Sequence, residues 1–267
     1  MVAAHKKEKK PWSTKRKVLF ALLIVIDIAL IGAAFWLWYD KQQEYDHVAA
    51  QVEVAQQSVQ PGTQDEPPVV DWAALKAQNS DVCAWVQIPD TPVNFPVYQG
   101  ATNDTYLRTG ADGNYSLGGL VFIDSQNTGP NLEDMQTMVY GHHLQDGSMF
   151  AWIDTMNQQQ VFDEHSRIWW VTEQANYALT PLFTYVLPES GDLTVQLQWP
   201  DLAAFRAHLA QRLGQANACR PDAAEVISRT DHVLTLVTCN YDNGRGRTLV
   251  VCVPQSVADG TTATAAS

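Results

Sequence analysis

An uninterrupted apolar segment near the N-terminus restricts this chain more than any other feature of its sequence. Residues 18–39 read VLFALLIVIDIALIGAAFWLWY, with Asp27 as the single charged side chain. At about 1.5 Å per residue, a helix of this length crosses the roughly 30 Å hydrocarbon core of a bilayer. The segment therefore predicts one transmembrane anchor. Asp27 either contacts a partner helix or adds an insertion free energy that this very apolar segment tolerates.

The charge distribution orients the predicted anchor. Seven of the 17 Lys and Arg residues lie within residues 1–17, and 10 basic residues stand against 27 acidic ones from residue 40 onward. A basic flank marks the cytoplasmic side, and Trp36, Trp38 and Tyr39 fit the aromatic belt at the other interface. We therefore expect a cytoplasmic tail and an extracellular remainder. A cleaved signal peptide is the alternative, but the apolar run is long and no small-x-small cleavage site follows it.

The part beyond the membrane is expected to be folded and acidic. The composition, 46% hydrophobic and 17% charged, is that of a globular protein. Its net negative charge excludes nucleic-acid binding, which needs a basic face on the folded part. Apolar side chains at spacings of three and four, followed by PGTQDEPP, predict a stalk helix and linker over 40–68. A folded domain over 69–254 and a flexible tail over 255–267 complete the predicted organisation.

The domain itself reads as mainly β. Eight short segments are rich in β-branched and aromatic residues, and two helical stretches, 70–78 and 200–216, interrupt them. Many strands at short spacing favour a closed barrel over a doubly wound sheet. The predicted strands are 82–89, 94–99, 119–124, 136–142, 167–172, 177–187, 232–239 and 247–253.

Cysteine placement points to one reactive thiol. Cys83 and Cys252 lie inside apolar strands and are expected to be buried, and Cys219 is expected to be inert. No pair has the C-x-x-C spacing of a metal site. Cys239 instead ends the strand HVLTLVTC, just before the polar run NYDNGRGR. A partly exposed thiol near arginines is the setting that favours a thiolate, so Cys239 is the candidate nucleophile.

Histidine and arginine residues could complete the chemistry. His142 follows a strand and precedes a Gly-containing turn, and imidazole can both donate and accept a proton near neutral pH. His143 has the same chemistry, but strand alternation lets only one of the two face the thiol. Arg245 and Arg247 lie two residues apart, and a guanidinium can stabilise an oxyanion.

These residues resemble the motifs of the sortase family, in particular those of class B. TLVTC at 235–239 is similar to the sortase signature TLxTC, and YGHHLQDGSMF at 140–150 resembles the class B segment YGHN-x-x-DGSMF. NFPV, GLVFID followed by Asn127, and RTLVV occur in the family's order over residues 69–254. The resemblance implies a closed eight-stranded β-barrel, with N-terminal helices and a helix between strands six and seven.

The resemblance also implies a cysteine transpeptidase. No Asp or Glu cluster has the spacing of a Ca²⁺ site, so we expect no cofactor and no metal. Cys239 would attack the Thr carbonyl in a C-terminal sorting signal of a secreted protein and form a thioester. His142 would protonate the departing amine, and Arg247, which directly precedes the apolar strand, would stabilise the oxyanion. An amine on a cell-wall precursor would then resolve the thioester. The alternatives are a pilin-polymerising enzyme with a Lys nucleophile, a hydrolase, and an inactive surface scaffold.

Four further residues are expected to contact the substrate: Asn94, Tyr140, Thr238 and Arg245. Asn94 could equally shape the turn before Pro96, and Tyr140 could be a core residue. Two positions depart from the class B pattern. His143 stands where the family usually has Asn, and Val237 stands where class B usually has Ser, which weakens the transfer of the NPxTN-like signal that class B enzymes often prefer.

Overall fold

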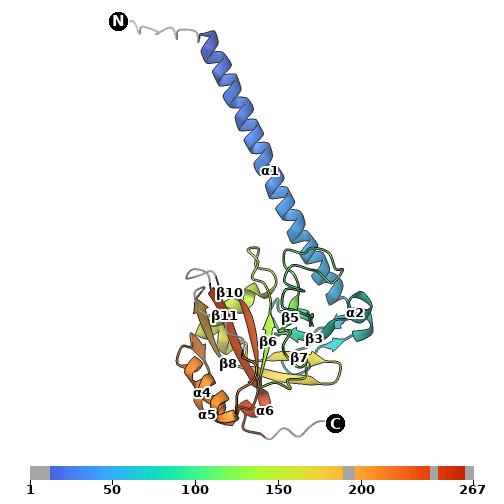
Figure 1. The fold of residues 1–267 in the computed structure, drawn as a ribbon, viewed down its shortest axis with the longest axis vertical. Coiled ribbons are helices and arrows are strands. Elements are labelled where there is room, and N and C mark those ends of the chain that lie inside the picture. Colours follow the sequence, from blue (N-terminus) through green and yellow to red (C-terminus); the bar gives the residue numbers. More distant parts are fainter. Residues whose placement is uncertain (1–12, 189–195, 241–245, 262–267) are drawn as a thin grey trace, which may run out of the picture. The chain divides into compact units, whose positions relative to one another are not determined.

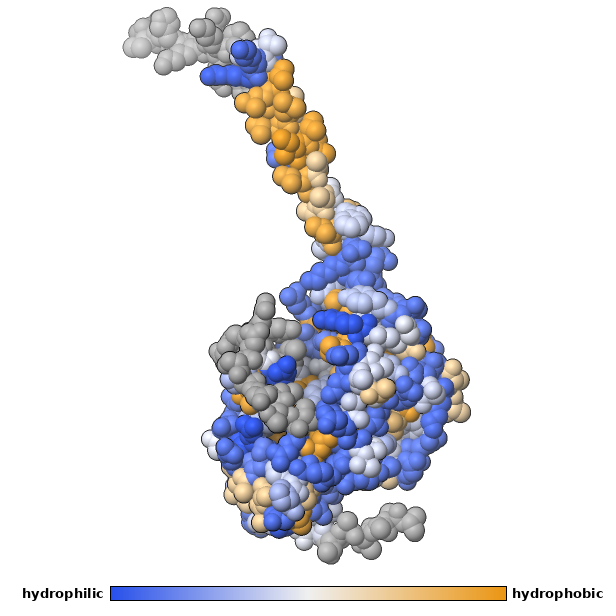
Figure 2. Space-filling view, in the orientation of Figure 1, coloured by the Kyte–Doolittle hydropathy of each residue, from blue (hydrophilic) through white to orange (hydrophobic). Residues whose placement is uncertain are grey.

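The computed structural model describes residues 13–188, 196–240 and 246–261 (Figure 1). The chain forms two compact units, one up to Glu44 and one from Tyr45 onward, and α1 (Thr14–Gln56) has residues in both. In the first unit, the side chains of α1 are exposed and mostly hydrophobic, as Figure 2 shows. This helix is long and apolar enough to cross a membrane, as the sequence predicts.

The last three turns of α1 belong to the second unit. Val48 and Ala55 are buried, and Tyr45 and Val52 pack beside them on the core. The amphipathic stripe predicted for a stalk therefore exists, but it packs into the folded unit because its apolar side chains find partners there. The predicted linker is also held in place: Trp169 Nε1 donates to the Thr63 carbonyl at 2.6 Å.

The predicted β-barrel is confirmed. Eight strands close into a ring because β11 pairs with β10 on one side and with β8 on the other. The ring order is β11-β10-β6-β5-β4-β3-β7-β8, with β6 parallel to β10 and β4 parallel to β5. The strands are β3 (Val82–Gln87), β4 (Asn94–Tyr98), β5 (Val121–Ile123), β6 (Gln136–Tyr140), β7 (Ile168–Thr172), β8 (Asn176–Pro188), β10 (Val233–Asn240) and β11 (Gly246–Pro254).

Side-chain alternation builds a core inside the barrel and a second core outside it. Val139, Leu236 and Val250 pack in one cluster, whereas their strand neighbours Val237 and Leu249 pack in another with the helices. The 3-10 helix η1 (Phe150–Asn157) contributes three fully buried side chains to the first cluster. These are Phe150, Ile153 and Met156.

Helices α4 (Leu202–Leu213) and α5 (Ala223–Arg229) cover the outer core. The expected helix between the sixth and seventh barrel strands is α4, and its first turn is capped by the Asp201 carboxylate, which accepts from Ala204 N at 2.8 Å. The other predicted helix is α2 (Trp72–Gln78).

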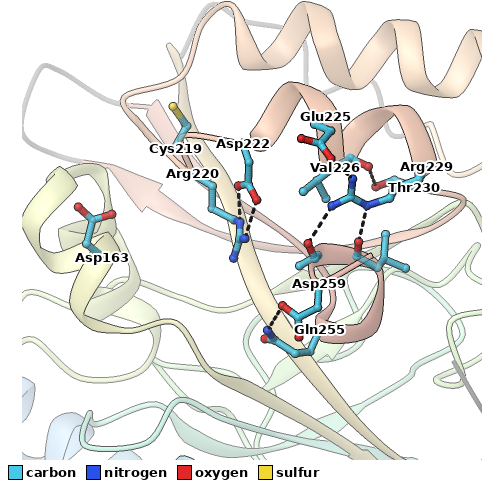
Figure 3. A network of polar contacts seen from close by, with 12 residues as sticks. Asp163, Cys219, Arg220, Asp222, Glu225, Val226, Arg229, Thr230, Gln255 and Asp259 are labelled. Atoms are coloured by element: carbon cyan, nitrogen blue, oxygen red, sulfur yellow. Dashed lines mark hydrogen bonds and ion pairs between the residues drawn. The ribbon is translucent and has the colours of Figure 1, made fainter. Parts of the chain in front are cut away.

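Several short elements have no counterpart in the sequence prediction, since none is long enough to show a period. Besides η1 and α5 they are β1 (Val59–Gln60), β2 (Val69–Val70), α3 (Gln159–Glu164), β9 (Ala218–Cys219) and α6 (Gln255–Ala258). Arg229 of α5 donates to the carbonyls of Val257 and Ala258, so the start of the predicted tail is ordered (Figure 3). Arg220 and Asp222 form a bidentate pair in the same network.

Candidate active site

Two adjacent strands bring the candidate nucleophile and the candidate arginine together. In the antiparallel β10–β11 ladder, Cys239 is the direct Cα partner of Arg247, and Thr238 is the partner of Thr248. Directly opposed residues lie about 4.5–5.5 Å apart at their Cα atoms. The structure describes Cys239 through its backbone position, and Arg245 lies outside the described residues.

The candidate histidines follow the strand on the other side of β10. β6 and β10 are parallel, with Tyr140 as the partner of Val237, and Gly141 N donates to the Val237 carbonyl at 3.1 Å. β6 ends at Tyr140, but the bond from Gly141 continues the pairing by one residue, and His142 is next in the chain. This register places His142 beside the end of β10.

Alternation separates the two faces of these strands. Thr238 is 2% exposed and alternates with Val237 of the outer core, so position 239 belongs to the outer face together with Val237. A Cβ built on Gly141 would lie 2.4 Å from the Phe150 ring inside the barrel, so position 141 faces inward. Position 142 follows it and belongs to the same outer face as positions 239 and 247.

His142 is anchored by a backbone carbonyl. Its Nε2 lies 2.7 Å from the Leu107 carbonyl oxygen, and a carbonyl can only accept, so Nε2 carries a proton. Burial lowers the pKa of His142, the hydrogen bond to Leu107 opposes this effect, and the nearby Arg108 charge lowers the pKa further. The net pKa lies below the ordinary value of 6.5. The neutral imidazole, with Nδ1 as an acceptor, is therefore the majority form at pH 7.

His143 has a different environment. Its Nδ1 lies 3.7 Å from Asp154 Oδ2, at ion-pair distance, and its side chain is 19% exposed. Asp154 belongs to η1 and is itself 7% exposed. The structure thus distinguishes the two adjacent histidines: His142 lies on the face of positions 239 and 247, and His143 pairs with a carboxylate of η1.

Tyr140 is hydrogen-bonded to a carboxylate and lies within electrostatic reach of Arg247. Its hydroxyl donates to Asp124 Oδ2 at 2.8 Å, and its ring packs 5.3 Å from that of Phe122. Burial and the Asp124 charge raise the pKa of Tyr140, whereas Arg247 lowers it, so the guanidinium acts on the phenol electrostatically. Tyr140 therefore belongs to the surroundings of the candidate arginine.

Two further predicted substrate contacts, Asn94 and Thr238, have different surroundings. The Asn94 side chain accepts from Trp85 Nε1 at 2.8 Å, and its backbone carbonyl accepts from Gln56. The side chain of Thr238 is buried on the inner face, and its Oγ1 makes no hydrogen bond within the described part of the chain. Thr238 therefore lies on the opposite face of β10 from position 239, whereas the Asn94 side chain is already engaged by Trp85.

Two of the other cysteines, Cys83 and Cys252, are unlike a reactive thiol. Burial, reinforced by Asp81, raises the pKa of Cys83 to about 12, and burial raises the pKa of Cys252 as well. Both therefore stay protonated near neutral pH. Cys219 is free and partly exposed at the short strand β9. Among the described residues, no three His, Cys, Asp or Glu side chains gather as metal ligands.

Sequence reasoning missed four residues around the site. Leu107 and Arg108 act on His142 from the long connection between β4 and β5, and Asp154 reaches His143 from η1. No periodicity marks either segment. Asp124 is the last residue of GLVFID, so that motif could have indicated it as a partner of Tyr140.

Comparisons with known proteins agree with this geometry. A family model described as a sortase domain matches residues 86–255. Sortase B of Listeria monocytogenes is 27% identical over 175 residues, which cover 64% of this chain and 69% of that protein. Sortase B of Staphylococcus aureus is 29% identical over 236 residues, which cover 86% of this chain and 93% of that protein.

Solved structures show the same fold. Sortase B of Clostridium perfringens has a TM-score of 0.61 at 27% identity, covering 67% of this chain and 97% of that chain. Sortase B of Bacillus anthracis, in complex with AAEK1, has a TM-score of 0.65 at 22% identity, covering 80% of this chain and 99% of that chain.

Proposed function

The chain belongs to the sortase family of cysteine transpeptidases, and from that premise we propose that it sorts secreted proteins to the cell wall. It cleaves their C-terminal sorting signal after Thr and joins the new carboxyl end to a cell-wall amine. The observation that carries this proposal is the shared outer face of positions 142, 239 and 247 at one end of the barrel. Acyl transfer needs a nucleophile, an acid–base group and a partner for the oxyanion, and these three positions supply them.

The first half-reaction forms a thioester. The thiolate of Cys239 attacks the Thr carbonyl carbon, and the carbonyl oxygen becomes an oxyanion. Arg247, the ladder partner of Cys239, offers a fixed positive charge and several N–H donors at that end of the strand pair. Collapse of the tetrahedral intermediate breaks the peptide C–N bond and leaves the Thr carbonyl on sulfur.

His142 supplies and removes the protons. Its Nε2–H is held by the Leu107 carbonyl, so Nδ1 is the nitrogen free to exchange a proton with substrate. The protonated ring gives that proton to the departing amine, and the neutral ring accepts one from the incoming amine. The lowered pKa favours the neutral form, which suits the second half-reaction and limits the protonated fraction available for the first.

Residues 18–39 are proposed to anchor the enzyme to the cell membrane as a single pass. The basic flank before this segment supports a cytoplasmic N-terminus, and the catalytic unit would then lie outside the cell. This placement suits the substrates, since both the sorting signal and the cell-wall amine are available at the outer face of the membrane. The partners are then secreted proteins and a wall precursor.

The proposal is tested by product identity. The full chain, in detergent micelles, is given Thr-containing sorting peptides together with either a cell-wall-type amine or a pilin-derived Lys peptide, and the products are identified by mass. Transfer to the wall-type amine supports the proposal. Transfer to Lys alone indicates pilin polymerisation, release of the free acid alone indicates a hydrolase, and no reaction at Cys239 indicates an inactive scaffold.

A further inference from the structure

A buried carboxylate links the two segments that carry His142 and Arg247. Asp154 lies on η1, between the buried residues Ile153 and Met156, and is itself 7% exposed. A carboxylate is costly to bury unless donors satisfy it, so its contacts indicate what holds it there. These contacts run to β11 on one side and to the residue after His142 on the other.

The contact with β11 is made through Thr248. Thr248 directly follows Arg247, is fully buried, and donates through Oγ1 to Asp154 Oδ1 at 2.5 Å. Asn157 Nδ2 donates to Thr248 Oγ1 at 2.8 Å and to Asp154 Oδ1 at 3.1 Å. These bonds tie one carboxylate oxygen to the inner face of β11, directly behind the candidate arginine.

The contact with the histidine segment uses the other oxygen. His143 Nδ1 lies 3.7 Å from Asp154 Oδ2, and the backbone of His143 pairs with Met149 in an antiparallel bridge. The Phe150 N–H also donates to the His142 carbonyl at 2.7 Å. The loop between His142 and η1 is therefore closed on itself, and Asp154 fixes its position relative to the barrel.

We propose that Asp154 is a positioning residue of the transpeptidase. Its two oxygens hold His143 and Thr248, and so set the distance between His142 on one strand end and Arg247 on another. The inference rests on the proposed function, since it assigns a role within that reaction. A misplacement of about 1 Å between catalytic groups can cost on the order of 100-fold in rate. Asn at this position keeps the shape but has a single acceptor oxygen and no charge, so it can no longer accept from Thr248 and also face His143 with a carboxylate oxygen.

The first test compares steady-state rates of sorting-peptide cleavage by the full chain in micelles. Asp154→Asn is expected to lower kcat by about 10- to 100-fold with KM nearly unchanged, because the substrate still binds while the reacting groups are misaligned. Asp163→Asn is the matched control, since Asp163 is an exposed carboxylate of α3 that accepts only from Gln159 in the described structure. Its rate should stay within about twofold of the parent.

Conservative replacements separate positioning from folding. His143→Asn and Thr248→Ser keep a donor toward Asp154 and should retain most of kcat, whereas His143→Ala and Thr248→Val should lose it. In the Asp154→Asn background, His143→Ala and Thr248→Val should lower kcat much less, because the network that they belong to is already broken. Equal kcat values for Asp154→Asn and Asp163→Asn, or a loss explained by the unfolded fraction at the assay temperature, would overturn the inference.

A readout without substrate keeps this test separate from the proposed function. The rate of Cys239 alkylation by iodoacetamide is followed against pH in the parent and in Asp154→Asn. The pH midpoint of alkylation follows the pKa of the Cys239 thiol. Loss of the Asp154 negative charge would by itself lower this midpoint, whereas displacement of the Arg247 positive charge would raise it. An upward shift supports positioning, and an unchanged or lower midpoint contradicts it. If the parent cleaves no sorting peptide, the proposed function fails while this comparison still decides the role of Asp154.

Discussion

Replacing Gly141 by Ala would place a methyl group where the core has no space for it. A Cβ at this position would lie 2.4, 2.6 and 2.9 Å from three atoms of the Phe150 ring. Carbon atoms in contact lie about 3.5–4.0 Å apart, so the ring or the backbone must move by roughly 1 Å. Phe150 is fully buried and cannot give way without disturbing η1.

The expected effects are a loss of stability and a larger loss of activity. Overpacking a core of this kind costs about 1–3 kcal/mol of unfolding free energy. Because Gly141 directly precedes His142, a shift of this size also moves the candidate acid–base group, which corresponds to a loss on the order of 100-fold in kcat. Thermal denaturation followed by near-ultraviolet circular dichroism reports the first effect, and sorting-peptide cleavage by the folded fraction reports the second.

A matched glycine provides the control. The nearest neighbours of a Cβ on Gly129 are the Glu133 carboxylate oxygens at 3.7 Å, an ordinary contact, so Gly129→Ala should behave like the parent. Adding Phe150→Leu to Gly141→Ala should recover part of the lost activity, because the smaller side chain leaves room for the methyl group. If Gly141→Ala and Gly129→Ala have the same melting temperature and kcat, the steric argument is refuted.

Three further predictions concern charge. Arg108→Gln should raise the pKa of His142 toward its ordinary value, since the Arg108 charge lowers it, and an NMR titration of the imidazole would show no shift if that charge were irrelevant. Burial raises the pKa of Asp134, but hydrogen bonds from Asn127, Thr128 and Gln198 outweigh this effect and lower the net pKa. The ionised Asp134 carboxylate therefore stabilises the fold at pH values above its unfolded pKa of about 3.9. Asp134→Asn should therefore lower the melting temperature at pH 7. This difference from the parent should begin to shrink as the pH falls below about 4 and continue to shrink until the pH has passed the lowered folded pKa; a pH-independent difference would count against it. Finally, Arg247→Ala should reduce kcat by about 10²–10³ and Arg245→Ala by much less, and the reverse order would show that the arginine is misassigned.

The sequence was sufficient for the barrel because its strands carry strong local signals. All eight predicted strands exist, since each combines β-branched residues with turn residues at its ends. The pairing of Cys239 with Arg247 also follows from sequence once the two strands form a tight antiparallel pair. A helix able to cross a membrane was equally visible, because Asp27 is the single charge in the 22 residues 18–39.

Features that depend on tertiary packing could not be predicted from the sequence. The stripe beginning at Tyr45 predicted a helix but could not show that its partner is the barrel core. The sequence alone also could not show which way His142 faces, because this follows from the inward direction of Gly141 at its contact with Phe150. Asp154 stands in a short 3-10 helix with no period, and its partners are 11 positions before it and 94 positions after it. Thr238 was expected to contact the substrate, yet strand alternation points its side chain into the core.

In the proposed reaction, Cys239 carries the acyl group. The parent and Cys239→Ala are mixed with a sorting peptide in the absence of an amine nucleophile, quenched at low pH, and examined by intact mass and by digestion. The parent should gain the mass of the peptide fragment ending at Thr, attached at Cys239 and removed by hydroxylamine, and Cys239→Ala should gain nothing. Turnover that persists in Cys239→Ala, or an adduct on another residue, would contradict the account.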